Sequence, residues 1–219
     1  MTDLLLVAVV LTNFVLLGSS RLAACIRVAA AQGILVGVMP LILYHDAVSV
    51  RTALIAAAGI TLKGIVFPWL FFRALRDVDV TREVEPFVGY TVSILIGVGA
   101  VAGSFWLGSR LVVPRPVPSA FVIPVAFSVI FIGLFLIVSR KTAISQALGY
   151  LVMENGIFAF GVSLALEEPF LVELGVLLDV FAATFLMGIM VFHISREFDH
   201  IDVGRLASLK DWTTRRYKS

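Results

Sequence analysis

Residues Gln146 to His193 read QALGYLVMENGIFAFGVSLALEEPFLVELGVLLDVFAATFLMGIMVFH, a stretch that is apolar enough to form two membrane-spanning helices. The stretch nevertheless contains three acidic residues, Glu154, Glu173 and Asp179. An ionisable side chain near the centre of a bilayer costs several kcal/mol, so it is rarely kept without a partner or a function. We therefore expect the remainder of the chain to form a membrane-embedded frame that holds these carboxylates.

The composition of the whole chain predicts an integral membrane protein. Of its 219 residues, 60% are hydrophobic and 15% are charged, and the mean hydropathy is +1.03. Soluble domains are about 45–50% apolar and about 25% charged. The net charge of +2 comes from basic residues at the ends of apolar runs, where membrane topology explains them, so nucleic acid is not an expected partner. The single cysteine, Cys25, excludes an internal disulfide and a Cys-ligated zinc or iron–sulfur site on this chain alone.

We expect an all-α fold, a polytopic membrane protein with about seven transmembrane helices. Seven apolar runs approach the length of about 20 residues that a helix needs to cross a bilayer. The third of them contains Lys63. In order, the predicted spans are Leu4–Ser19, Ala24–Tyr44, Thr52–Phe72, Phe87–Ser109, Phe121–Ser139, Ala143–Leu166 and Phe170–Ile194.

A proline-rich connection divides the predicted spans into two groups. The segment VPRPVPS, Val113 to Ser119, cannot continue a helix, because its three prolines lack amide donors and restrict the backbone. The predicted organisation is a four-helix N-terminal membrane half (1–112), the connection (113–120), a three-helix unit (121–195) and a polar cytoplasmic tail (196–219).

The distribution of Lys and Arg predicts the orientation in the membrane. With seven spans, the loops after spans one, three and five lie on the same side as the tail, and this side holds 13 of the 17 basic residues. The opposite side holds Arg51, Arg110 and Arg115. Because Lys and Arg accumulate in cytoplasmic loops, the N-terminus is expected outside and the C-terminus in the cytoplasm. The 13 residues are Arg21, Arg27, Arg73, Arg76, Arg82, Arg140, Lys141, Arg196, Arg205, Lys210, Arg215, Arg216 and Lys218.

Three ionisable residues are predicted at one depth in the membrane. At about 1.5 Å per residue, Glu154, Asp179 and Lys63 each lie roughly 14 to 16 Å from the nearer end of their spans. In a hydrocarbon core about 30 Å thick, that depth is the midplane. They can form a lateral polar row that serves as a proton path. The alternative is a structural clamp, in which an acid–lysine pair only holds helices together.

Two further residues of the seventh span are weaker candidates for the path. Glu173 is expected near the outer surface, where its closeness to Pro169 also suits an interfacial residue. His193 is expected near the cytoplasmic end, where its closeness to Arg196 also suits a residue at the level of the lipid headgroups.

The titratable groups are the only chemistry that the sequence offers. It has no nucleotide-binding loop, no paired-histidine metal motif and no nucleophile with a base partner, so we expect neither a catalytic site nor a metal or cofactor site on this chain. A carboxylate beside a lysine in a low-dielectric interior can exchange a proton when the distance between them changes. Such a relay has no energy source of its own and needs a partner that drives it.

Several segments resemble the hydrogenase-4 component E family. They are Leu148–Gly156 (LGYLVMENG), Leu171–Val176 followed by Asp179, the Ile60–Pro68 stretch with Lys63, and the tail Ile201–Lys210. Members of that family are membrane subunits of group 4 [NiFe] hydrogenase or formate hydrogenlyase complexes, which are related to respiratory complex I. The resemblance covers most of the chain.

The last three predicted spans are also similar to the K-type subunit of complex I and to the C subunit of multi-subunit sodium/proton antiporters. The key helix of the complex I subunit reads Gly-Leu-Glu-x-Met-x-Asn. When Gly149, Met153 and Asn155 are aligned with it, Leu151 takes the glutamate position and Glu154 follows three residues later. Three residues are nearly one helical turn, so Glu154 lies on nearly the same face. Asp179 is the candidate for a second acid, from its depth alone.

The resemblance implies a membrane subunit that contributes part of a proton path, with the redox chemistry on other chains. The [NiFe] centre and the iron–sulfur clusters are then expected on partner subunits. The expected partners are antiporter-like and other membrane subunits, a peripheral hydrogenase module and the lipid bilayer, in a bacterial plasma (inner) membrane. The alternatives are a non-conducting scaffold subunit of the same complex, or a subunit of a cation/proton antiporter without a redox module.

Overall fold

A computed structural model describes residues 2–43, 50–78, 87–111, 119–164 and Gly188. The fold of this part is all-α. Its helices are α1 (Thr2–Gly18), α2 (Leu22–Leu43), α3 (Val50–Thr61), the π-helical turn η2 (Leu62–Val66), α4 (Phe67–Val78), α5 (Tyr90–Arg110), α6 (Val122–Ser139) and α7 (Ala143–Leu164).

These helices coincide with six of the predicted spans, because α3, η2 and α4 follow one another without a break and form one rod. Within the described residues, four helical stretches are long and apolar enough to cross a membrane, and α1 is a shorter apolar helix. The four are Leu22–Leu43, Ala56–Arg76, Tyr90–Arg110 and Val122–Ser139. The seventh predicted span, Phe170–Ile194, lies outside the described residues. The count of seven spans and the sides of the two termini stay predictions.

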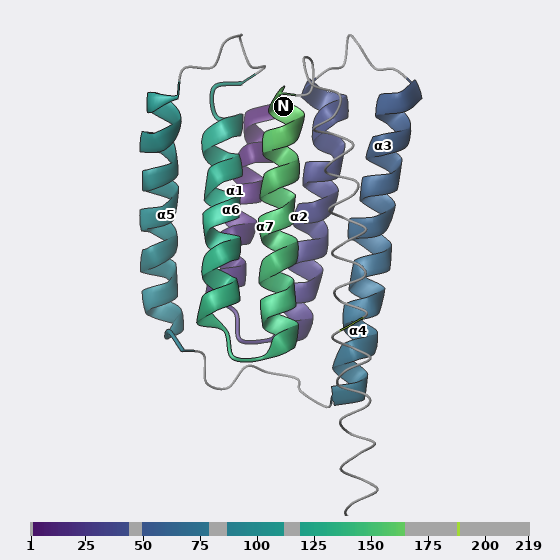
Figure 1. Cartoon of the computed structure of the whole chain (residues 1–219), viewed down its shortest axis with the longest axis vertical. Coiled ribbons are helices and arrows are strands. Elements are labelled where there is room, and N and C mark those ends of the chain that lie inside the picture. Colours follow the sequence, from purple (N-terminus) through teal and green to yellow (C-terminus); the bar gives the residue numbers. More distant parts are fainter. Residues whose placement is uncertain (1, 44–49, 79–86, 112–118, 165–187, 189–219) are drawn as a thin grey trace, which may run out of the picture.

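The helices run side by side in a bundle with α5 at one edge and the α3–η2–α4 rod at the other (Figure 1). Between the two edges, α6 and α7 pack against each other and cover α1 and α2. Helix α2 contacts α1, α7 and the rod, and α5 contacts α1 and α6. One apolar core is shared by helices from both predicted groups, so the groups are packed together.

Glycines bring α6 and α7 into backbone contact. A Cβ atom added at Gly133 would lie 2.4 Å from the backbone nitrogen of Met153, and one at Gly149 would lie 2.8 Å from that of Ile137. A Cβ at Gly156 would lie 2.7 Å from the nitrogen of Ile130. Real Cβ atoms do not approach so closely, so these three positions require glycine. The register of α7 against α6 is thereby fixed, and with it the position of Glu154.

The sequence contains two glycine pairs with the four-residue spacing that allows close helix approach in membranes, Gly33/Gly37 and Gly99/Gly103, and their surroundings differ. Gly33 and Gly37 of α2 face the rod, where an added Cβ would lie 2.7 Å from Lys63 Cβ and 2.8 Å from Ile60 Cγ1 respectively. This pair therefore allows the close helix approach that its spacing predicts. At Gly99 and Gly103 of α5, an added Cβ would have no atom of another described helix within 4 Å. Within the described chain, this second pair makes no helix contact.

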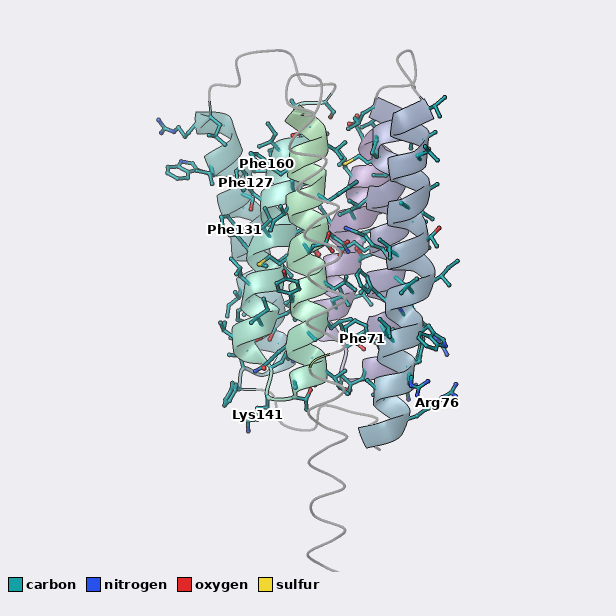
Figure 2. The ribbon with its side chains drawn as sticks, turned by 45° about the vertical axis from the view of Figure 1, so that its right-hand side comes forward. Phe71, Arg76, Phe127, Phe131, Lys141 and Phe160 are labelled. Carbon is teal, nitrogen blue, oxygen red and sulfur yellow. The ribbon has the colours of Figure 1, made fainter. Side chains whose placement is uncertain are left out.

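Basic side chains gather at one end of the bundle, where Figure 2 labels Arg76 and Lys141. Arg140, at the same end, differs from the solvent-facing loop residue that the topology predicts. It is 4% exposed, its Nη2 donates a hydrogen bond of 3.0 Å to the carbonyl of Leu17, and its guanidinium lies 4.9 Å from the centroid of the Tyr90 ring. A cation suits the carbonyl end of a helix, so Arg140 is buried because it caps α1.

Gly149→Ala is expected to destabilise the full-length chain by about 1–3 kcal/mol, because the new methyl group meets the backbone of α6 and cannot be accommodated by a side-chain rotation. Thermal unfolding of the detergent-solubilised protein measures the effect. Gly103→Ala is the matched control and should be neutral or slightly stabilising, since its methyl group meets no described atom. Equal stability of the two variants would contradict the backbone contact.

Candidate functional site

A buried ion pair joins the rod to α7. Nζ of Lys63 lies 2.5 Å from Oε1 of Glu154, and the two side chains are 1% and 0% exposed. Nζ of Lys63 also lies 4.7 Å from the centroid of the Phe158 ring, which follows Glu154 by one helical turn. The ammonium is therefore held between a carboxylate and an aromatic face, both supplied by α7.

Lys63 occupies a π-helical turn, and Pro68 explains why the turn is there. The amide of Phe67 bonds to the carbonyl of Leu62, five residues earlier. In a regular α-helix, residue 68 would donate to the carbonyl of Gly64, but proline has no amide hydrogen and its ring clashes with that carbonyl. Widening the preceding turn relieves the clash. Single π turns inside α-helices are frequent at functional sites.

Gly33 lets the Lys63 stem lie directly against α2. Since a Cβ at position 33 would be 2.7 Å from Lys63 Cβ, any larger residue there would displace the lysine. Thus the ammonium is positioned by three features together: a glycine of α2, the π turn of the rod and the acid of α7.

Stability alone does not explain a buried pair of this kind. Removing two charges from water costs several kcal/mol per ion, and their attraction repays that cost only with good geometry. Well-packed apolar residues of similar volume are often as stable or more stable. In a membrane, ionisable residues that face the bundle interior commonly mark ion or proton pathways.

A second polar cluster comes from α1, α2 and α7, and one of its residues, Asn155, follows Glu154 in the sequence. Nε2 of Gln32 donates hydrogen bonds to Thr12 Oγ1 (3.0 Å) and Asn13 Oδ1 (2.8 Å). Nδ2 of Asn155 donates to Gln32 Oε1 at 3.3 Å. Gln32, Asn13 and Asn155 are all 0% exposed. We call this set, Thr12, Asn13, Gln32 and Asn155, the amide cluster.

The structure places two of the five predicted path residues, Lys63 and Glu154, in direct contact. The other three, Asp179, Glu173 and His193, lie outside the described residues. The amide cluster was not predicted, because only the ionisable groups of the spans were candidates. The available signal was an uncharged amide inside each of two apolar helices, Asn13 in α1 and Gln32 in α2.

No group of three or more His, Cys, Asp or Glu that could hold a metal ion occurs in the described part of the chain. The chemistry that the ion pair and the amide cluster offer is proton exchange and hydrogen bonding.

Comparison with known proteins shows what the chain is similar to. The model described as NADH-ubiquinone/plastoquinone oxidoreductase chain 4L matches residues 121–211, which include α6, α7 and Glu154. Hydrogenase-4 component E of Escherichia coli K12 is 26% identical over 155 residues, which cover 71% of this chain and 72% of that protein. The chain is thus similar to hydrogenase-4 component E over 71% of its length, and residues 121–211 are similar to a complex I subunit. Together with its apolar helices, these similarities support a multi-pass membrane protein.

Two further relatives extend the comparison. An uncharacterized protein of Mycobacterium tuberculosis is 33% identical over 205 residues, 92% of each chain. Hydrogenase-4 component E of Shigella flexneri is 26% identical over 155 residues, 71% of this chain and 72% of that protein. No solved structure gives a significant match.

Lys63 lies outside the part that resembles chain 4L, so this chain supplies the partner of Glu154 from its own N-terminal helices.

A double-mutant cycle should detect the ion pair. Lys63→Met is expected to cost about 3–5 kcal/mol of stability, because it leaves a buried carboxylate without its cation. Glu154→Gln should cost less, since the amide oxygen still accepts a hydrogen bond. The double variant should be more stable than the sum of the two losses implies, as measured by unfolding of the detergent-solubilised chain. Additive losses would show that the two residues do not interact.

Proposed function

We propose that this chain is a membrane subunit of a multi-subunit membrane-bound hydrogenase of the hydrogenase-4 or formate hydrogenlyase type. In that complex it forms part of a proton-translocation path coupled to redox chemistry on partner subunits. The buried contact between Lys63 and Glu154 is the observation that supports this proposal most directly. Similarity to hydrogenase-4 component E and to chain 4L supports the proposed setting, a complex related to respiratory complex I.

The proton step follows from the geometry of the pair. With Lys63 in contact, the negative form of Glu154 is stabilised by the ammonium. When the ammonium moves away, the carboxylate is left in a low-dielectric interior and takes up a proton; when the ammonium returns, the proton is released. The proposed element for this movement is the π turn, because its conversion to an α turn would rotate Lys63 relative to α7.

The remaining predicted residues extend the path. Asp179 is proposed at the same depth as the pair, Glu173 nearer the outer surface and His193 nearer the cytoplasm. The proposed setting is a seven-span chain in a bacterial inner membrane, with its N-terminus outside and its C-terminus in the cytoplasm. Antiporter-like subunits adjoin it, and a peripheral module carries the [NiFe] centre and the iron–sulfur clusters that supply the energy.

A scaffold role is the second candidate, and the closed geometry of the pair favours it. A direct contact of 2.5 Å compensates both charges and links the rod to α7, as a structural clamp would. The clamp predicts that substitutions affect assembly alone. The relay predicts effects on proton transfer in assembled complexes.

Glu154→Gln should leave the complex assembled while proton uptake per turnover falls several-fold, since glutamine keeps the size and a hydrogen bond but cannot ionise. Uptake is measured in vesicles that contain the intact complex, at equal assembly and with hydrogenase turnover recorded in parallel. Glu154→Asp, which keeps an ionisable group, should retain part of the uptake. Unchanged uptake in Glu154→Gln would refute the relay role.

Lys63→Met should shift the pH dependence of proton uptake, because it removes the charge that sets the protonation of Glu154. The matched control is Lys141→Met, the same substitution at an exposed lysine beside the Phe87 ring, which should leave the profile unchanged. An effect of Lys63→Met that is confined to the amount of assembled complex would favour the clamp.

A further inference from the structure

The hydrogen bonds of the amide cluster have a defined direction. The hydroxyl of Thr12 donates to the carbonyl of Val9 at 2.6 Å, so its oxygen is an acceptor for Gln32. Both hydrogens of Gln32 Nε2 are thereby used on α1, by Thr12 and Asn13, and its Oε1 accepts from Asn155. Donation therefore runs one way, from α7 through α2 to α1.

This arrangement leaves one polar atom at each end of the cluster without a hydrogen bond. Nδ2 of Asn13 and Oδ1 of Asn155 have no partner among the described residues, although both side chains are 0% exposed. An unmade hydrogen bond at a buried group costs about 1–3 kcal/mol. The atom without a partner on α1, Nδ2 of Asn13, is a donor, and the one on α7, Oδ1 of Asn155, is an acceptor.

Water is the ligand whose chemistry fits both ends. A cation would meet the amide hydrogens of Asn13, and an anion would meet the carbonyl oxygen of Asn155, whereas water accepts from the first and donates to the second. The cluster itself carries no net charge. Buried waters typically occupy such places, making about three hydrogen bonds to polar groups that otherwise lack partners.

On two helices, a residue of the amide cluster is the sequence neighbour of a residue at the ion pair. Gln32 precedes Gly33, against which the Lys63 stem packs, and Asn155 follows Glu154. In Figure 2, oxygen and nitrogen atoms gather about half-way along the bundle, near α2 and α7. Three of the four cluster residues lie outside the part that resembles chain 4L, so the cluster depends on the N-terminal helices α1 and α2.

We propose that Asn13, Gln32 and Asn155 hold internal water beside the Lys63–Glu154 pair, and that this water exchanges protons with Glu154. The second part rests on the proposed function. In the step, an O–H bond of a protonated water breaks and an O–H bond of the Glu154 carboxyl forms, leaving neutral water and a neutral acid; no electrons are transferred. The reverse step returns the proton.

The water is tested directly by cryo-electron microscopy of the intact complex, at a resolution that shows ordered water elsewhere in its interior. The wild type is expected to show water density within hydrogen-bonding distance of Asn13 Nδ2 or Asn155 Oδ1. In Gln32→Met, which nearly keeps the volume but removes the amide, this density should be lost. Absence of the density in the wild type would overturn the water site.

Proton exchange is tested by uptake per turnover in vesicles that contain the assembled complex. Gln32→Met should lower it several-fold at unchanged assembly. Ser128→Ala, at a residue that is also 0% exposed but bonds within its own helix to the Val125 carbonyl, should leave it unchanged. If Gln32→Met does not assemble, Asn13→Leu replaces it, since it removes the free donor from the opposite end.

Measuring Glu154→Gln in parallel separates the two proposals. A loss of uptake in Glu154→Gln without a loss in Gln32→Met would overturn proton exchange through the cluster and leave the proposed function standing. No loss in either variant would overturn the proposed function, and with it proton exchange through the water. In that case, the density map would still test whether water occupies the site.

Discussion

The contact between the ammonium of Lys63 and the carboxylate of Glu154 is the interaction on which the arrangement of the bundle depends. Both groups are buried, and each would be costly without the other. The pair therefore sets the rotation of the rod relative to α7, and it does so with an interaction that is strong only over a short distance. The glycines of α2, α6 and α7 supply the close helix packing that this distance requires. The ion pair thus depends on the close helix packing that the glycines allow.

Most of the helical framework can be predicted from apolar run lengths, because each helix must span the same thickness of hydrocarbon. The predicted start of the last-but-one span, Ala143, is the first residue of α7. The rod is longer than its predicted span, Thr52–Phe72, since it continues through Arg73 and Arg76 to Val78. Arg76 lies at the end of the bundle (Figure 2). Hydropathy marks where a helix leaves the apolar region, whereas hydrogen bonding decides where it ends.

The site was less predictable, for two physical reasons. Depth along a helix follows from the rise per residue, so Lys63 and Glu154 could be placed at one level. Their orientation toward each other depends on the π turn, which changes the direction of the Lys63 side chain relative to a regular α-helix and has no signal in a hydropathy pattern. The amide cluster was missed because amides add little to charge counts, although a buried amide needs partners as a buried charge does. Arg140 shows the same limit, since its burial follows from a carbonyl of α1 that the sequence does not place beside it.

The π turn of the rod has a consequence for how the helix tolerates changes in length. A π turn is equivalent to one residue inserted into an α-helix, accommodated locally and not passed along the chain. Beyond it, α4 still directs Phe67, Leu70, Phe71 and Ala74 toward the core. At the level of Lys63, the rod therefore contains one residue more than a regular α-helix of the same length would have. Shortening it there would straighten the helix, while shortening it elsewhere would turn the apolar face of α4 out of the bundle.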